Sequence, residues 1–134
     1  MESVAEIERN MAHAIGTERY IKHNSGLLVF TDGVNQLRQD ADAFWLVDAI
    51  TSHQIDHRDK RFQCWELVVN KDHSAVLTMK EDTGQPELVK QEIPYTNFPL
   101  ENIKFYVQEG GYSNWNGTSE NWTTCLVLML PSEY

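Results

Sequence analysis

Apolar residues recur every three or four positions in the first part of the chain, a spacing that predicts amphipathic helices. Ser3 and Glu6 form a capping box at the start of the first helix, and Gly16 marks its end. Thr17 can cap a second, short helix that runs toward His23. The apolar residues that share one face of the first helix are Val4, Ile7, Met11, Ala14 and Ile15.

Two more helices are expected before residue 57. Thr31 caps the first of them, and Asp40 or Asp42 caps the second, which runs to about His53. Because the second is apolar on nearly every side, we expect it to be the central helix, covered over most of its circumference. The apolar run at 27–30 is too short to assign to a helix or a strand.

From Phe62 onward the apolar period changes to two, which predicts strands that are buried on one face. Residues 70–73 and 82–86 have the composition of turns between strands. The run at 125–130 is apolar on both sides and predicts an interior strand with helices over at least one face. The alternating residues are Trp65, Leu67 and Val69, then Ala75, Leu77 and Met79, then Val89, Gln91, Ile93 and Tyr95, and last Ile103, Phe105 and Val107.

Helices that precede hairpin-linked strands indicate the α+β class. We expect N-terminal helices packed on one face of a mostly antiparallel sheet of about five strands. No linker separates two cores, so the prediction is a single domain over residues 1–134, mainly helical over 1–57 and mainly strands over 62–134. A small sheet has edges that need cover, and a homodimer is one way to cover them.

Composition and charge narrow the choice of partner. The chain carries 11 lysines and arginines against 20 aspartates and glutamates, a formal net charge of −9, so we expect no direct nucleic-acid binding. No run of about 18 apolar residues occurs, so no membrane span is expected. Residues 1–15 are acidic and amphipathic, unlike a secretory signal, and Cys64 and Cys125 fit buried thiols in a reducing cytoplasm.

His53 and His57 are candidate metal ligands. They stand four residues apart with Asp56 between them, so a continuous helix would place them on one face, as in zinc-protease motifs. Imidazoles at a helix C-terminus also interact favourably with the helix dipole, and no third ligand follows at a convincing spacing. We therefore favour a structural role for this pair and expect neither a metal nor a cofactor.

Asp48 and Asp32 are candidate catalytic carboxylates. Asp48 lies within an otherwise apolar helix, a setting in which general bases are found. A structural carboxylate bonded to Trp, Tyr or backbone donors of a neighbouring segment would have the same setting, and we favour this role because no nucleophile can be named beside Asp48. Asp32 lies where a helix opens, and capping suits it better than anion binding.

The segment 110–122 combines glycine and asparagine with aromatic residues, as adaptable binding loops do. Its aromatic residues, Tyr112, Trp115 and Trp122, are candidate contacts for a protein partner. An ordinary hairpin loop whose tryptophans fold back onto the sheet fits the same pattern.

Several strings of residues occur together over nearly the whole chain after Gly16. They are Gly-Thr-Glu-Arg-Tyr at 16–20 with His23, Phe-Thr-Asp-Gly-Val at 30–34, Ala-Phe-Trp-Leu-Val-Asp-Ala-Ile at 43–50 with Ser-His-Gln at 52–54, Phe62 with Trp65, and Leu-Pro-Ser-Glu-Tyr at 130–134. In these strings the chain resembles a small uncharacterised bacterial family, a domain of unknown function with some members in mobile-element settings. The resemblance implies a bacterial cytoplasmic protein and transfers no catalytic residue.

The functional expectation is a non-catalytic accessory or interaction protein of the bacterial cytoplasm, associated with a mobile element and bound to an unknown protein partner. One alternative is a small hydrolase-like enzyme that uses Asp48 or the pair His53 and His57. Another is an acidic nucleic-acid mimic, which needs carboxylates along one face at phosphate-like intervals.

Overall fold

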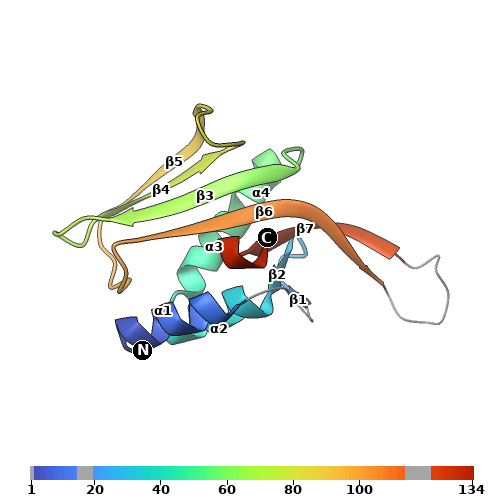
Figure 1. The fold of residues 1–134 in the computed structure, drawn as a ribbon. Helices are drawn as coiled ribbons and strands as arrows, with labels where there is room; N and C mark the ends of the chain where they lie inside the picture. Colours follow the sequence, from blue (N-terminus) through green and yellow to red (C-terminus); the bar gives the residue numbers. More distant parts are fainter. Residues whose placement is uncertain (1, 15–19, 114–121) are drawn as a thin grey trace.

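The computed structural model describes residues 2–14, 20–113 and 122–134, except for the side chains of residues 112, 113, 122 and 123. Its helices are α1 (Val4–His13), α2 (Asp32–Asp40), α3 (Phe44–Ser52), the single turn α4 (Gln54–His57) and the final 3-10 turn η1 (Pro131–Glu133). Its strands are β1 (Tyr20–Lys22), β2 (Val29–Thr31), β3 (Phe62–Val69), β4 (Ala75–Lys80), β5 (Glu87–Ile93), β6 (Asn102–Ser113) and β7 (Trp122–Met129). The fold is α+β, with helices and a sheet in separate layers (Figure 1).

The strands form one seven-stranded sheet in the order β1-β2-β7-β6-β3-β4-β5. Strands β2 and β7 are parallel, and the other neighbours are antiparallel. The coarse class agrees with the prediction, whereas the expected strand number of about five is too low and the sheet is mixed. The parallel pair joins residues almost a hundred positions apart, and no local pattern encodes such a pairing.

The two unpredicted strands lie in the segment 20–31. Strand β1 occupies part of the segment for which we predicted a second short helix toward His23, so that prediction is wrong. Strand β2 overlaps the run at 27–30 that was too short to assign, and its three residues are all buried. A strand of three residues is too short to show a period. Its conformation also depends more on pairing with neighbouring strands than on its own sequence.

The first and third predicted helices begin as expected. The Ser3 hydroxyl accepts a hydrogen bond from the Glu6 backbone N–H at 3.2 Å. Thr31 caps α2, because its hydroxyl accepts from the Val34 backbone N–H at 3.2 Å, and Val34 and Leu37 are buried.

The start of α3 differs from the prediction. Neither Asp40 nor Asp42 caps it: the N-cap is Ala43, which makes no side-chain cap bond. Asp40 ends α2, where its carboxylate accepts hydrogen bonds from Asn10 at 2.9 Å and Gln36 at 2.7 Å. Asp42 has a φ of +51°, a turn conformation that aspartate tolerates better than most residues.

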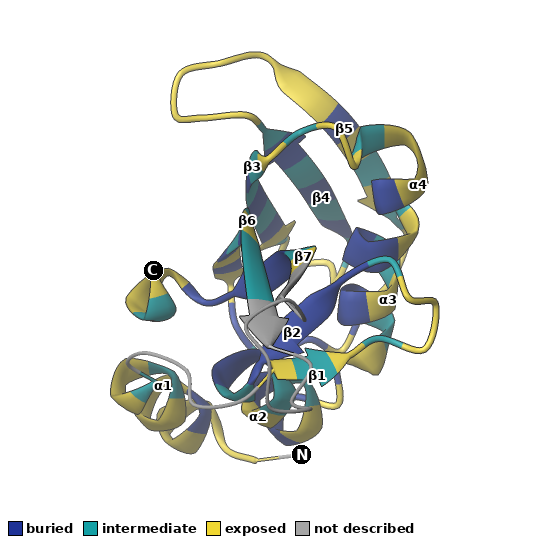
Figure 2. Ribbon diagram, turned by 90° about the vertical axis from the view of Figure 1, so that its right-hand side faces the viewer, coloured by how far each residue is buried: buried dark blue, intermediate teal, exposed yellow. Residues whose placement is uncertain are grey.

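The core lies between the helices and the inner face of the sheet. Alternate residues of β3, β4 and β6 point into it, as the period of two predicts. Strand β7 is interior, as predicted, with residues 126–130 all buried. Helix α3 buries one side and leaves Phe44 43% exposed, so it is not covered over most of its circumference. Figure 2 shows exposed residues on the outer sides of α1 and α4.

The outer face of the sheet carries a second, smaller apolar cluster formed by Val29, Val127 and Met129. The C-terminal residue Tyr134 lies close by, with its ring 5.7 Å from that of Phe62 and 5.3 Å from that of Tyr106. The C-terminal turn therefore covers part of the outer face.

Candidate functional site

The C-terminal turn is bonded to the start of α2. The Glu133 carboxylate accepts hydrogen bonds from the Thr31 hydroxyl at 2.6 Å, the Gly33 backbone N–H at 3.3 Å and the Leu130 backbone N–H at 3.0 Å. A methyl group on Gly33 would stand 2.7 Å from the Glu133 carboxyl carbon. The anion at this helix N-terminus is thus supplied by the chain itself, and Asp32 is the first residue of the helix rather than its cap.

A buried amide pair joins the helical layer to the sheet. Gln54 and Gln63, both 0% exposed, exchange two side-chain hydrogen bonds of 2.8 Å. The Gln63 amide oxygen also accepts from the Trp65 indole N–H at 2.8 Å, and its nitrogen donates to the Lys60 carbonyl at 3.0 Å. In a low-dielectric interior such a satisfied network fixes the orientation of its members.

His53 belongs to the same junction. The helix breaks at this residue, which closes α3 and opens α4. Its Nε2 atom is 2.8 Å from the Gln91 amide oxygen on β5, and its ring lies 5.6 Å from the Trp65 ring. His57 therefore lies on a separate element, and the described residues hold no cluster of three or more His, Cys, Asp or Glu that could bind a metal.

Asp48 pairs with His23. The Asp48 side chain is 63% exposed, and its Oδ1 atom lies 2.7 Å from His23 Nε2. On the other side of the imidazole, Nδ1 lies 2.9 Å from the Ser25 hydroxyl and accepts the Ser25 backbone N–H at 3.1 Å. Ser25 was not among the predicted site residues, because a short helix toward His23 was expected where the structure has β1 and the turn after it.

This trio has the composition of a hydrolase triad, but its geometry is that of a turn. Three backbone N–H groups that follow His23 are used within the turn. Those of Ser25, Gly26 and Leu27 donate to His23 Nδ1, the His23 carbonyl and the Ser25 hydroxyl, respectively. An oxyanion needs N–H donors that are not already bonded, and these three are bonded. The contact between His23 and Asp48 connects the β1–β2 hairpin to α3.

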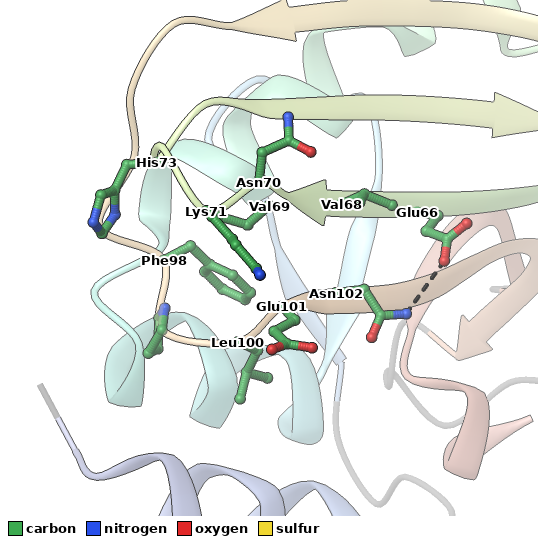
Figure 3. Close-up of a pocket in the computed structure, with 11 residues that line it drawn as sticks. Glu66, Val68, Val69, Asn70, Lys71, His73, Phe98, Leu100, Glu101 and Asn102 are labelled. Carbon is green, nitrogen blue, oxygen red and sulfur yellow. Dashed lines mark hydrogen bonds between the residues drawn. The ribbon is translucent and has the colours of Figure 1, made fainter.

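A recess lies where the β3–β4 turn meets the segment before β6. It has a volume of about 680 Å³ and combines apolar walls, such as Phe98 and the 42%-exposed Val68, with charged groups. Figure 3 shows Lys71 and Glu101 near its middle. At one end the Asn102 amide donates to the Glu66 carboxylate at 3.2 Å.

The segment 95–102 lines three recesses. The second, of about 360 Å³, lies against Trp45 and Asp42, and the third, of about 510 Å³, lies against α1. The segment is held firmly: Phe98 and Leu100 are buried, and the Thr96 backbone N–H donates to the His73 carbonyl at 2.8 Å. We call residues 95–102 the rim segment.

The β3–β4 turn opposite the rim segment is fixed by its own hydrogen bonds. The Asp72 carboxylate accepts from the Ser74 hydroxyl at 2.6 Å and from its backbone N–H at 3.0 Å. These bonds lower the pKa of the Asp72 carboxyl. The turn at 70–73 was predicted, but the recess was not, because it forms between segments about thirty residues apart.

The aromatic loop is described only in part. Strands β6 and β7 extend together past the other strands in Figure 1, with Ser113 opposite Trp122 near the end of this ribbon. Trp115 lies outside the described residues, as do the side chains of Tyr112 and Trp122. The predicted role of these three residues stays a prediction.

Both cysteines are free and half-buried on the strands where the sequence placed them. Burial is the largest cause that raises the pKa of each thiol. For Cys64 the nearby Asp82 carboxylate raises the pKa further, while Lys104 lowers it. At neutral pH both groups are thus held as thiols rather than thiolates.

Comparison with known proteins gives a family but no activity. No helix within the described residues is long and apolar enough to cross a membrane. No curated protein and no solved structure matches the chain. The model of one family matches residues 5–134, nearly the full length, and thus includes the strings on which the resemblance was based. The chain belongs to DUF6876, a family of unknown function.

Proposed function

We propose that this protein is a non-catalytic binding protein that receives a segment of a protein partner in the recess between the β3–β4 turn and the rim segment. The observation that carries the proposal is the contrast in how polar groups are used. Five polar side chains of the strings are bonded to other side chains across the fold: His23, Asp48, His53, Gln54 and Glu133. The recess, in contrast, presents charged groups and the exposed Val68 to solvent.

The chemistry of the recess suggests what would bind there. Val68 offers an exposed apolar contact beside the buried side chains of Phe98 and Leu100. Lys71 and Glu101 offer one cation and one anion. An extended peptide segment with an apolar side chain flanked by charged groups complements this mixture. Both walls are fixed by hydrogen bonds, so little ordering entropy would be lost on binding.

The proposal is tested by affinity capture from the source cells, with the captured protein identified and then titrated in purified form. Val68→Asp and Lys71→Glu should each weaken that partner by roughly tenfold or more, as expected for residues at the centre of an interface. Arg9→Glu makes the same change of charge as Lys71→Glu on exposed α1 and should leave binding unchanged. Equal binding by all three variants would contradict the proposal.

Tyr112, Trp115 and Trp122, which the sequence singles out as contact residues, are a second contact that we propose for the same partner. Pull-down and size-exclusion measurements with Trp115→Ala and Trp122→Ala test this part separately. Unchanged partners and an unchanged oligomeric state would remove the ribbon from the proposal and leave the recess.

We also propose that the protein works in a bacterial cytoplasm and that its gene is associated with a mobile element. The support is the resemblance of the sequence strings and the two half-buried thiols without a disulfide. Fractionation of cells that express the tagged protein from its own promoter tests the location.

A further inference from the structure

The two edges of the sheet differ in length. Strand β1 ends one side with three residues, and β5 ends the other with seven. Within the described residues, β5 pairs with β4 alone, and its other side presents backbone N–H and C=O groups that can pair with another strand. A register shift at Met79/Lys80 leaves 89–93 as the regular part of β5.

Two copies of β5 could pair antiparallel in several symmetric registers. One of these registers fits the side chains of β5 better than the registers on either side of it. In such a pair one residue lies opposite its own copy, and the inner and outer faces stay continuous. A register centred on Lys90 or on Glu92 sets like charges opposite each other. Centred on Gln91, the pairing sets Lys90 opposite Glu92 on the outer face, twice by symmetry, and Val89 opposite Ile93 on the inner face.

We propose that the protein forms a homodimer in which two β5 strands pair antiparallel about Gln91, joining both sheets into one. The centre of that register coincides with the centre of the regular segment 89–93. The pairing of Lys90 with Glu92 and the extent of the regular segment therefore both indicate Gln91 as the centre of the register. This inference is independent of the partner proposed for the recess.

The surroundings of Gln91 add apolar surface to the interface. Since His53 is bonded to the Gln91 side chain at 2.8 Å, the α3–α4 junction of each copy lies next to the two-fold axis. Ile55, two residues further along this junction, is 60% exposed, and Leu88 on β5 is 39% exposed. Strand pairing alone buries little area, so cover of these side chains supplies the hydrophobic part of the association.

Long-range repulsion opposes the dimer, because each copy carries a formal charge of −9. At about 0.15 M salt the Debye length is about 8 Å, which screens distant charges while Lys90 and Glu92 remain in contact across the strands. Sedimentation equilibrium at this ionic strength, over micromolar to sub-millimolar concentrations, measures the dissociation constant.

The decisive experiment uses charge reversal and mixing. Lys90→Glu sets glutamates opposite glutamates, and Glu92→Lys sets lysines opposite lysines, so each variant alone should dissociate roughly tenfold or more readily than the wild type. Mixed together, the two variants regain unlike pairs at both positions and should form a one-to-one heterodimer. Arg9→Glu, on α1 far from β5 in Figure 1, matches the charge change of Lys90→Glu and should dimerise like the wild type.

Each outcome decides the proposal. A wild-type chain that stays monomeric throughout the concentration range would overturn it. A dimer that tolerates both single variants would place the interface elsewhere and overturn it too. Dissociation of both variants without recovery on mixing would reject the register about Gln91.

Discussion

The amide pair under α4 and the recess beside the rim segment use polar groups in opposite ways. Gln54 and Gln63 are fully buried, and their amide groups are bonded to each other and to Trp65 or the backbone. Lys71 and Glu101 line an open recess of about 680 Å³, a volume within the usual range of ligand pockets. The first region holds the layers together, and the second is where we propose that a partner binds.

This difference teaches where to look for function in a chain of this kind. Gln54 and Trp65 belong to the strings that carry the family resemblance, and so does Glu133. Their contacts are architectural. The recess is lined by residues outside those strings, so a search confined to the strings would have explained the fold and overlooked the surface.

The largest effect is expected at Gln63. Gln63→Leu leaves the Gln54 amide and the Trp65 indole N–H buried without their partner, which should lower the free energy of unfolding by about 3 kcal/mol. Urea unfolding measures the loss. Gln85→Leu, in an exposed turn, makes the same chemical change and should stay within about 0.5 kcal/mol of the wild type. Equal losses in the two variants would contradict the architectural role of the network.

The hydrogen bonds of the Glu133 carboxylate should contribute somewhat less to the free energy of unfolding. Glu133→Ala removes three hydrogen bonds to a carboxylate and should cost about 2 kcal/mol of unfolding free energy. Gly33→Ala should be destabilising in the wild type, because the added methyl group displaces that carboxylate.

A double-mutant cycle isolates this contact. In the Glu133→Ala background the space beside Gly33 is open, so Gly33→Ala should stabilise the helix by up to about 1 kcal/mol. Destabilisation by Gly33→Ala in both backgrounds would show that the glycine is required for a reason other than the Glu133 carboxylate.

Local sequence signals predicted elements whose cause is local. The Thr31 cap, the turn at 70–73 and the alternation in β3 each depend on residues within a few positions of one another, and each is confirmed. Strands β1 and β2 were missed because strands of three residues are too short to show a period, and β2 depends in addition on pairing with the distant β7. The length of the chain and its local patterns were enough to predict the α+β class. The number of strands could not be predicted, because it depends on pairing between distant segments.

The same distinction applies to the site. Asp48 was singled out for its apolar neighbours in sequence, yet its partner, His23, lies 25 positions away. The recess joins the β3–β4 turn to the rim segment, and neither segment alone has a composition that indicates a binding site. Periodicity reports which face of an element is buried and gives no information on which exposed segments meet.

The trio at the β1–β2 turn offers a sharper test of the non-catalytic proposal. Asp48→Asn should cost less than about 1 kcal/mol of unfolding free energy, because the Asp48 carboxylate is 63% exposed and its pairing is screened by solvent. Ser25→Ala should leave labelling by a fluorophosphonate probe at the level of the wild-type protein. Labelling of the wild type that disappears in Ser25→Ala would support the hydrolase alternative and reject the assignment of this trio to architecture.

The smallest effects are expected at Cys64 on the outer face of the sheet, where substitutions of nearby charged residues should change the reactivity of the thiol. Because its pKa is raised by burial and then by Asp82, Asp82→Asn should lower that pKa and speed alkylation of Cys64 at a fixed pH near 8. Lys104→Gln should raise the pKa and slow the reaction, and labelling of both cysteines should accelerate as the pH increases. Cys125 is an internal control, since its pKa is raised by burial and lowered by Lys22 rather than by these two groups. Mass spectrometry of timed iodoacetamide reactions separates the two thiols, and parallel changes at both would mean that the substitutions loosen the sheet instead of acting through charge.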